Sequence, residues 1–186
     1  MKSMDERTTH KEQRAAAARF VRDAAAVVRP GHLGSTKDPG DAWVEGEAGK
    51  FWGRFGSAGL LVFDAGRGVL LQHRAIWSHH GGTWGLPGGA LHAGEAAVAG
   101  ALREAWEEAG VPRENMELLF TSVYDVGYWS YTTVVVSAVE PFEAVISDPE
   151  SLALEWVPLD DVAELPLHPG FKAAWPELRG RLEGSN

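Results

Sequence analysis

Three glutamates lie close together in a segment whose apolar spacing predicts a helix over residues 95–109. Glu104, Glu107 and Glu108 are spaced i, i+3 and i+4, so a helix places all three carboxylates on one face. Like charges at this spacing destabilise a helix by about 0.2–0.5 kcal/mol per pair. Glu107 and Glu108 also precede Gly110 in the last turn, where the helix dipole disfavours acids. The cluster therefore suits the binding of a hard cation such as Mg2+, which prefers oxygen ligands, better than it suits a solvated acidic face.

The same helix carries an apolar stripe that can hold the acidic face toward a ligand. Four residues about a third of a turn from the glutamates recur at helical period and are expected to face the core: Val98, Leu102, Ala105 and Ala109. Arg103, four residues before Glu107, offsets part of the negative charge but cannot neutralise three acids.

Apolar runs on both sides of this helix predict the strands that must position it. Residues 57–63 and 68–74, joined by a short turn that contains glycine, predict a β-hairpin. Further strands are expected over 83–86, 132–139 and 153–159. Asp160 and Asp161 resemble the N-cap of a short helix, and a last helix is expected within 169–182. This irregular mixture predicts an α+β fold, built as an α/β/α sandwich with a mixed sheet.

The first 50 residues read as a separate segment. A narrow apolar stripe predicts a helix over residues 5–29, which Pro30 and Gly31 end. The linker composition of residues 31–50 predicts a loop, so we divide the chain into an arm with linker, 1–50, and a main domain, 51–186. The helical arm is expected to pack on the domain or on a second subunit, which leaves a homodimer open.

Composition excludes several classes of function. The net charge of −9 and the lack of a Lys/Arg-rich run argue against stable nucleic-acid binding. No run of about 18 apolar residues and no apolar leader are present, so we expect no membrane span and a cytoplasmic location. The absence of cysteine excludes disulfides, thiolate metal sites and thiol nucleophiles. No serine-nucleophile, Walker or dinucleotide motif occurs.

Residues 88–111 resemble the Nudix box, G-x5-E-x7-R-E-U-x-E-E-x-G-U, where U is apolar. Its fixed positions are filled by Gly89, Glu95, Arg103, Glu104, Glu107, Glu108 and Gly110. The resemblance to this MutT-like superfamily implies a Nudix-type sandwich. It also implies a hydrolase that uses Mg2+, or Mn2+ in its place, to cleave the pyrophosphate bond of a nucleoside diphosphate linked to another moiety. A small nucleotide or nucleotide derivative is thus the expected partner.

Two other functions occur on this fold. An isomerase of isoprenoid diphosphates normally needs a reactive cysteine, which this chain lacks. A non-catalytic Nudix-like domain that binds a regulatory ligand usually has an eroded box, whereas this box is intact. The sequence therefore favours the hydrolase, with the ligand-binding domain as the alternative.

The resemblance also implies roles for individual residues of the box. The implied metal ligands are the carbonyl of Gly88 and the carboxylates of Glu107 and Glu108. Glu104 is implied either as a further ligand or as the base that activates water. Arg103 is expected to hold the glutamates in place.

Outside the box the resemblance is looser. Arg74 lies where family members often place a phosphate-contacting arginine, with a surface strand arginine as the alternative. Glu150 resembles a distal acid that serves some members as an extra ligand or base, and a plain loop glutamate is the alternative. Tyr128 fits a position typical of dinucleoside polyphosphate hydrolases, or is an aromatic residue in a turn. The histidines, His79 and His80 included, are dispersed and are expected to be loop or surface residues rather than a metal cluster.

Overall fold

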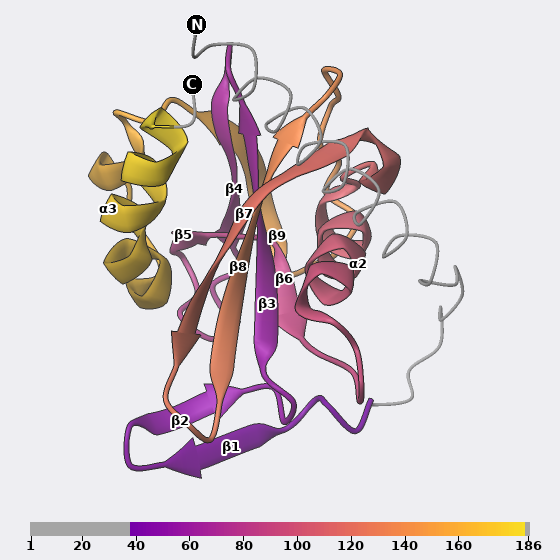
Figure 1. The fold of residues 1–186 in the computed structure, drawn as a ribbon, viewed down its shortest axis with the longest axis vertical. Coiled ribbons are helices and arrows are strands. Elements are labelled where there is room, and N and C mark those ends of the chain that lie inside the picture. Colours follow the sequence, from indigo (N-terminus) through magenta and orange to yellow (C-terminus); the bar gives the residue numbers. More distant parts are fainter. Residues whose placement is uncertain (1–37, 185–186) are drawn as a thin grey trace, which may run out of the picture.

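The computed structural model describes residues 38–184, so the helix predicted over residues 5–29 lies outside the described part of the chain. A seven-stranded sheet stands between two helices, with α2 (Ala97–Ala109) on one face and α3 (Pro169–Glu183) on the other (Figure 1). This arrangement is the predicted α+β sandwich. None of the helices described is long and apolar enough to cross a membrane.

The sheet is mixed, as predicted. Its strands are β3 (Ser57–Asp64), β4 (Gly68–Arg74), β5 (Trp84–Gly85), β6 (Gly88–Ala90), β7 (Met116–Asp125), β8 (Ser130–Ala138) and β9 (Ser151–Val157). The order runs β5-β4-β3-β8-β7, while β6 pairs with β3 and β9 pairs with β4. Only the β3–β8 pair is parallel among these neighbours.

Strand β3 divides one of its edges between two partners. Its last residues, Phe63 and Asp64, pair with β4, while its first residues, 57–59, pair with β6. Strand β4 diverges from β3 after two residue pairs and pairs with β5 at Gln72 and His73, while β9 pairs with β4 from Val69 to Arg74. This divergence leaves room for Gly88 and Gly89 of β6 beside the middle of the sheet, below the acidic face of α2.

Alternating residues of the central strands build two cores. Leu60 and Val62 face α2, whereas Leu61 and Phe63 face α3, because successive side chains of a strand point to opposite faces. The predicted stripe on α2 is buried at all four positions: Val98, Leu102, Ala105 and Ala109. Gly110 ends α2 in the left-handed conformation, with a φ of 63°, as glycine after a helix commonly does.

The structure differs from the sequence-based expectation at two places. Residues 43–52, most of which were expected to be linker, form a hairpin of β1 (Trp43–Gly46) and β2 (Gly49–Trp52). The hairpin is held from outside: Tyr128 donates its hydroxyl to the carbonyl of Gly49, and the Phe51 ring stacks on Trp129 with centroids 4.3 Å apart. Strand β7 was missed as well, because its side chains are mostly half-exposed and alternate weakly.

Short helical turns complete the description. A 3-10 turn, η1 (Arg113–Asn115), links α2 to β7, and a second, η2 (Val162–Glu164), follows β9. Asp161 is the N-cap of η2, as predicted, although its side chain makes no capping hydrogen bond.

Candidate active site

Of the three box glutamates that lie on α2, two point inward and one points outward. Glu108 is buried, and its Oε2 accepts hydrogen bonds from the backbone N–H of Gly88 at 3.0 Å and from Nε2 of Gln72 at 3.3 Å. The Glu104 side chain is 16% exposed, whereas that of Glu107 is 55% exposed. The helix therefore presents two buried carboxylates beside the sheet and a third at the solvent edge.

Arg103 ties the acidic face to the turn that precedes α2. Its guanidinium donates twice to the carboxylate of Glu95, at 2.9 Å each, and once to the carbonyl of Ala90 at 3.0 Å. The same group donates to Glu104 at 2.7 Å and to Glu107 at 3.3 Å. This set of hydrogen bonds needs the planar guanidinium group with five N–H donors that only arginine offers. Arg103 thus contacts three glutamates of the box, Glu95, Glu104 and Glu107, which is the arrangement expected of a residue that holds them in place.

The Gly88-Gly89 pair allows the backbone to approach these carboxylates closely. A Cβ on Gly89 would lie 2.7 Å from the carboxylate carbon of Glu104, and one on Gly88 would lie 2.4 Å from the carbonyl oxygen of Ala58. Any larger residue would displace either the glutamate or the β6–β3 pairing. Glycine is therefore required at both positions by space, without any need for a positive φ.

The buried carboxylates lack enough positive charge to balance them. Burial raises the pKa of Glu104 to about 7, against the opposing effect of Arg103, and the charge of Glu107 adds to the increase. Burial also raises the pKa of Glu108 to about 8, with a further increase from Glu104 and Glu150 that the Gly88 hydrogen bond and Arg74 only partly oppose. Perturbed acids of this kind concentrate at functional sites.

The pKa of Arg103 is also raised, which for an arginine favours the charged form. Burial alone would lower the pKa of its guanidinium, but the hydrogen bonds and charges of Glu95 and Glu104 outweigh burial and raise that pKa well above its ordinary value. Arg103 is therefore charged at any accessible pH. Its single positive charge still faces the four glutamates of the box, so the site as a whole remains negatively charged.

A divalent cation fits this donor set. The available atoms are carboxylate oxygens, which hard cations such as Mg2+ prefer, and the glycine pair keeps side chains out of their way. A cation would also supply the positive charge that the raised pKa values of Glu104 and Glu108 show to be lacking. The residues present therefore suit the metal that the box implies.

The residues predicted outside the box divide into two groups. Glu150 and Arg74 lie close enough to Glu108 for their charges to act on its pKa. The backbone carbonyl of Glu150 also accepts the N–H of Ala75 at 2.7 Å, which joins the two segments. Tyr128 instead packs on the β1–β2 hairpin, where its ring lies 6.2 Å from that of Phe51.

Sequence reasoning missed several side chains that border the carboxylates. Gln72 and Ser151 are buried polar residues on adjacent strands, joined by a hydrogen bond of 2.8 Å. Tyr131, at the start of β8, has its pKa raised by burial, and the charges of Glu104 and Glu108 add to that effect. Gln72 could have been found from the sequence, because it is a polar residue at an inward-facing position of an otherwise apolar strand.

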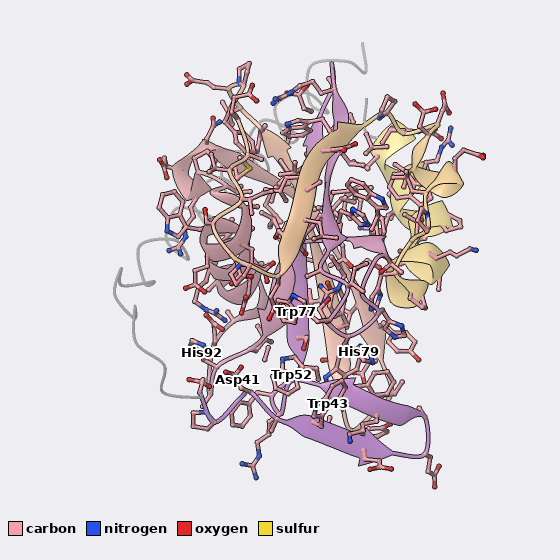
Figure 2. All side chains as sticks on the ribbon, turned by 180° about the vertical axis from the view of Figure 1, so that it is seen from behind. Asp41, Trp43, Trp52, Trp77, His79 and His92 are labelled. Atoms are coloured by element: carbon pink, nitrogen blue, oxygen red, sulfur yellow. The ribbon has the colours of Figure 1, made fainter. Side chains whose placement is uncertain are left out.

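The β4–β5 loop and the β1–β2 hairpin meet at one end of the sheet. Figure 2 shows Trp43 of the hairpin next to His79 of the loop. The ring of Trp43 lies 5.3 Å from that of Trp52 and 5.0 Å from that of His79, both edge-on. The loop that follows Arg74 is therefore bordered by aromatic side chains, and three of them, Trp43, Trp52 and Trp77, are exposed.

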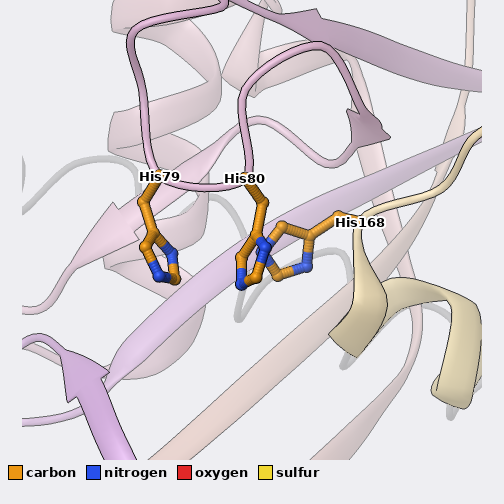
Figure 3. A group of neighbouring side chains, drawn as sticks. All are labelled: His79, His80 and His168. Carbon is orange, nitrogen blue, oxygen red and sulfur yellow. The ribbon is translucent and has the colours of Figure 1, made fainter.

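His79 and His80 are exposed loop residues, as expected, but with His168 they form a cluster instead of being dispersed. His79 and His80 of the β4–β5 loop lie next to His168, the N-cap of α3, and one ring nitrogen from each falls within 4.8 Å of the others (Figure 3). His168 lies nearly 90 positions after His79 and His80, so only the fold brings it to the other two.

The model of the NUDIX domain family matches residues 53–178, and the chain belongs to this family. Its intact box, sandwich fold and buried carboxylates are those of a Nudix hydrolase of the pyrophosphohydrolase type.

Several known proteins are similar to this chain. "Putative 8-oxo-dGTP diphosphatase 3" of Mycobacterium tuberculosis is 47% identical over 161 residues, which cover 81% of this chain and 74% of that protein. A crystal structure of the Nudix hydrolase RenU from M. smegmatis is 48% identical with a TM-score of 0.70, covering 78% of this chain and 96% of RenU. The NUDIX domain of Shewanella oneidensis NrtR, complexed with ADP ribose, is 25% identical with a TM-score of 0.54, and the match covers 71% of this chain and 90% of that one.

Proposed function

We propose that this chain uses Mg2+ to hydrolyse a pyrophosphate bond in a nucleoside diphosphate linked to a further group, with the oxidised nucleotide 8-oxo-dGTP as its substrate. The observation that carries the chemistry is the pair of buried carboxylates, Glu104 and Glu108, set against a glycine turn and short of positive charge. The choice of 8-oxo-dGTP is supported by the name of the mycobacterial relative that is 47% identical.

The cation would be held at the solvent edge of α2 by Glu107 and Glu108, together with the carbonyl of Gly88 and with Glu104 or Glu150 as a further ligand. When bound, Mg2+ or Mn2+ would neutralise charge on the phosphate oxygens of the substrate. Arg74, whose charge acts on Glu108, would contact a phosphate group of the substrate.

A carboxylate of the site would take the proton of the attacking water. Glu104 suits this role, because burial raises its pKa above that of an ordinary glutamate and so makes it a stronger base. Arg103 holds Oε1 of Glu104 at 2.7 Å, so the second carboxylate oxygen is the one left to face water. Water forms the new P–O bond, Glu104 receives its proton, and the bridging oxygen leaves with the departing phosphate group.

A substrate panel tests this proposal. The purified chain is assayed with 8-oxo-dGTP, dGTP, ADP-ribose, NADH, a nucleoside-diphosphate sugar and a dinucleoside polyphosphate, with Mg2+, Mn2+ or EDTA. We expect turnover only with a divalent cation and the highest kcat/KM for 8-oxo-dGTP. Higher kcat/KM for any other member of the panel would overturn the choice of substrate.

Matched variants test the site itself. Glu107→Gln removes one charge and no volume, so the variant should fold normally and lose most activity. Glu164→Gln makes the same change at an exposed position of η2 and should leave kcat/KM unchanged. If Glu107→Gln turns over its substrate like the wild type, the metal-site assignment is wrong.

A further inference from the structure

We propose that His79, His80 and His168 form a second cation site, built from imidazole nitrogens, that binds a divalent transition metal such as Zn2+. One ring nitrogen from each residue lies within 4.8 Å of the other two (Figure 3). Imidazole is a typical ligand of zinc, copper and nickel, whereas Mg2+ prefers the oxygen atoms of the carboxylate site. The two sites thus select different metals.

The rings are nearly close enough for shared coordination. In a tetrahedral site with Zn–N bonds of about 2.0–2.1 Å, ligand nitrogens lie roughly 3.3 Å apart. The candidate ligand nitrogens lie within 4.8 Å of one another, so each pair must approach by at most about 1.5 Å to reach that spacing. Because His79 and His80 are exposed, side-chain rotation can supply it.

The backbone of the β4–β5 loop is already fixed in the arrangement that the site needs. Nε of Arg74 donates to the carbonyl of His79 at 3.3 Å, and the hydroxyl of Thr83 donates to the carbonyl of His80 at 2.6 Å. His80 has a φ of 55° and is the one non-glycine residue with positive φ within residues 38–184. This left-handed conformation breaks the alternation of extended chain, so two consecutive imidazoles can approach one another.

The third histidine is anchored from another element. The backbone N–H of His168 donates to the carbonyl of Trp84 at 2.7 Å, which fixes the start of α3 against β5. Its Nδ1 accepts the N–H of Gly170 at 3.2 Å and caps the helix. Nε2 is therefore the nitrogen left for a cation. Binding there moves the ring proton to Nδ1, and the capping hydrogen bond to Gly170 is lost.

The charges around the cluster favour neutral rings with free lone pairs. Burial lowers the pKa of His168 to about 4, and the positive charges of His80, Arg74 and His79 lower it further. Burial, His80 and Arg74 likewise lower the pKa of His79. Neutral imidazole is the form that binds metal. Trp43 packs edge-on against the His79 ring, with the two centroids 5.0 Å apart.

Calorimetric titration of Zn2+ into the full chain, purified without a histidine tag and with Mg2+ in excess, tests the proposal. We expect about one equivalent of Zn2+ to bind. His80→Asn and His168→Asn should each weaken binding at least about tenfold, because even the loss of an outer-shell partner weakens metal affinity 10–100-fold. Asparagine is a favourable N-cap, so His168→Asn removes the ligand and keeps the helix start.

Two controls separate this site from other ways of binding zinc. His92→Asn removes a half-buried histidine outside the cluster, and Glu107→Gln disables the carboxylate site; both should bind Zn2+ like the wild type. A chain that binds no Zn2+ in excess Mg2+, or a His168→Asn variant with unchanged affinity, overturns the proposal. The proposal is also overturned if Glu107→Gln no longer binds Zn2+ while the histidine variants still bind it.

A spectroscopic measurement checks the geometry independently of affinity. In 15N-labelled protein, Zn2+ should shift the ring nitrogens of all three histidines and the amide of Gly170, whose capping bond is broken. If Zn2+ binds but leaves the rings of His80 and His168 unshifted, the cluster is only a packing contact between aromatic rings, and the proposal is wrong.

Discussion

The side-chain amide of Gln72 donates to Oε2 of Glu108 at 3.3 Å, while its own oxygen is buried and accepts no hydrogen bond from the described residues. Gln72 therefore acts on Glu108 purely as a donor. Its second hydrogen bond, to the hydroxyl of Ser151 at 2.8 Å, fixes the amide in this orientation. A polar side chain at a fully buried position of β4 is thus explained by the carboxylate that it orients.

Gln72→Met should lower activity without lowering stability. Methionine keeps the length of the side chain and removes both the donor to Glu108 and the unpaired acceptor, whose burial is unfavourable. We expect kcat/KM to fall about 10–100-fold, as for other side chains that orient a metal ligand, with little change in the free energy of unfolding.

Steady-state kinetics at saturating Mg2+ and urea denaturation measure the two quantities. Ser151→Ala is the matched comparison, because it removes only the bond that orients the amide and keeps the donor to Glu108; its kcat/KM should fall less than that of Gln72→Met. Activity of Gln72→Met equal to that of the wild type would show that Glu108 needs no support from β4.

Arg103→Lys should destabilise the fold and abolish activity even though the charge is kept. Lysine cannot reproduce the two bonds to Glu95 together with those to Ala90 and Glu104. Several buried acceptors then lose their donor, and breaking a buried ion pair typically costs about 3–5 kcal/mol. Chemical denaturation of the metal-free protein measures the loss.

Arg179→Lys provides the comparison on the surface. Arg179 pairs with Glu183 one helical turn away on α3, where solvent screens the interaction. The free energy of unfolding and kcat/KM of this variant should match the wild type. A similar stability for Arg103→Lys and Arg179→Lys would contradict the positioning role of Arg103.

Much of this site follows from local sequence pattern. The spacing of Glu104, Glu107 and Glu108, and the stripe that includes Leu102, predict which face of α2 is buried, because a helix has one period. The β3–β4 hairpin follows in the same way from two apolar runs and a turn that contains Gly66. These features depend on residues that are neighbours in sequence.

Features that depend on distant segments were not predictable in this way. The β1–β2 hairpin is held by Tyr128 and Trp129, nearly 80 residues further along the chain. His168 reaches His79 and His80 only because α3 begins against β5. The Glu108 carboxylate points inward, where Gly88 and Gln72 donate hydrogen bonds to it, whereas Glu107 points outward. These donors lie outside α2, so no helical pattern specifies them.

The stability of the metal-free protein should fall as the pH rises from about 6.5 to 8. The pKa values of Glu104 and Glu108 are raised from 4.5 to about 7 and about 8. The folded protein therefore binds more protons than the unfolded chain in this window, and its free energy of unfolding decreases with pH. His79 and His168 have lowered pKa values and act in the opposite sense, but only below about 6.5.

Denaturation in EDTA across this pH range measures the effect. The double variant Glu104→Gln/Glu108→Gln should show no such fall, since both titrating groups are absent. Mg2+ should restore stability to the wild type at pH 8, because it binds the ionised carboxylates of the folded state only. Metal-free wild type that gains stability between pH 6.5 and 8 would contradict the raised pKa values.

Gly89→Ala should inactivate the protein while preserving its fold. A Cβ at this position would lie 2.7 Å from the carboxylate carbon of Glu104, so the carboxylate must move by several tenths of an ångström or more. Misplacement of a catalytic group by about 1 Å can cost about 100-fold in rate, and we expect a decrease in kcat/KM of that order. Because φ at Gly89 is not positive, alanine adds no backbone strain.

Gly180→Ala, on α3 with no atom within 4 Å of the added Cβ, is the matched control. It should raise the free energy of unfolding by about 0.5–1 kcal/mol and leave kcat/KM unchanged. If Gly89→Ala is as active as Gly180→Ala, the carboxylate of Glu104 tolerates displacement and cannot be the group that activates water.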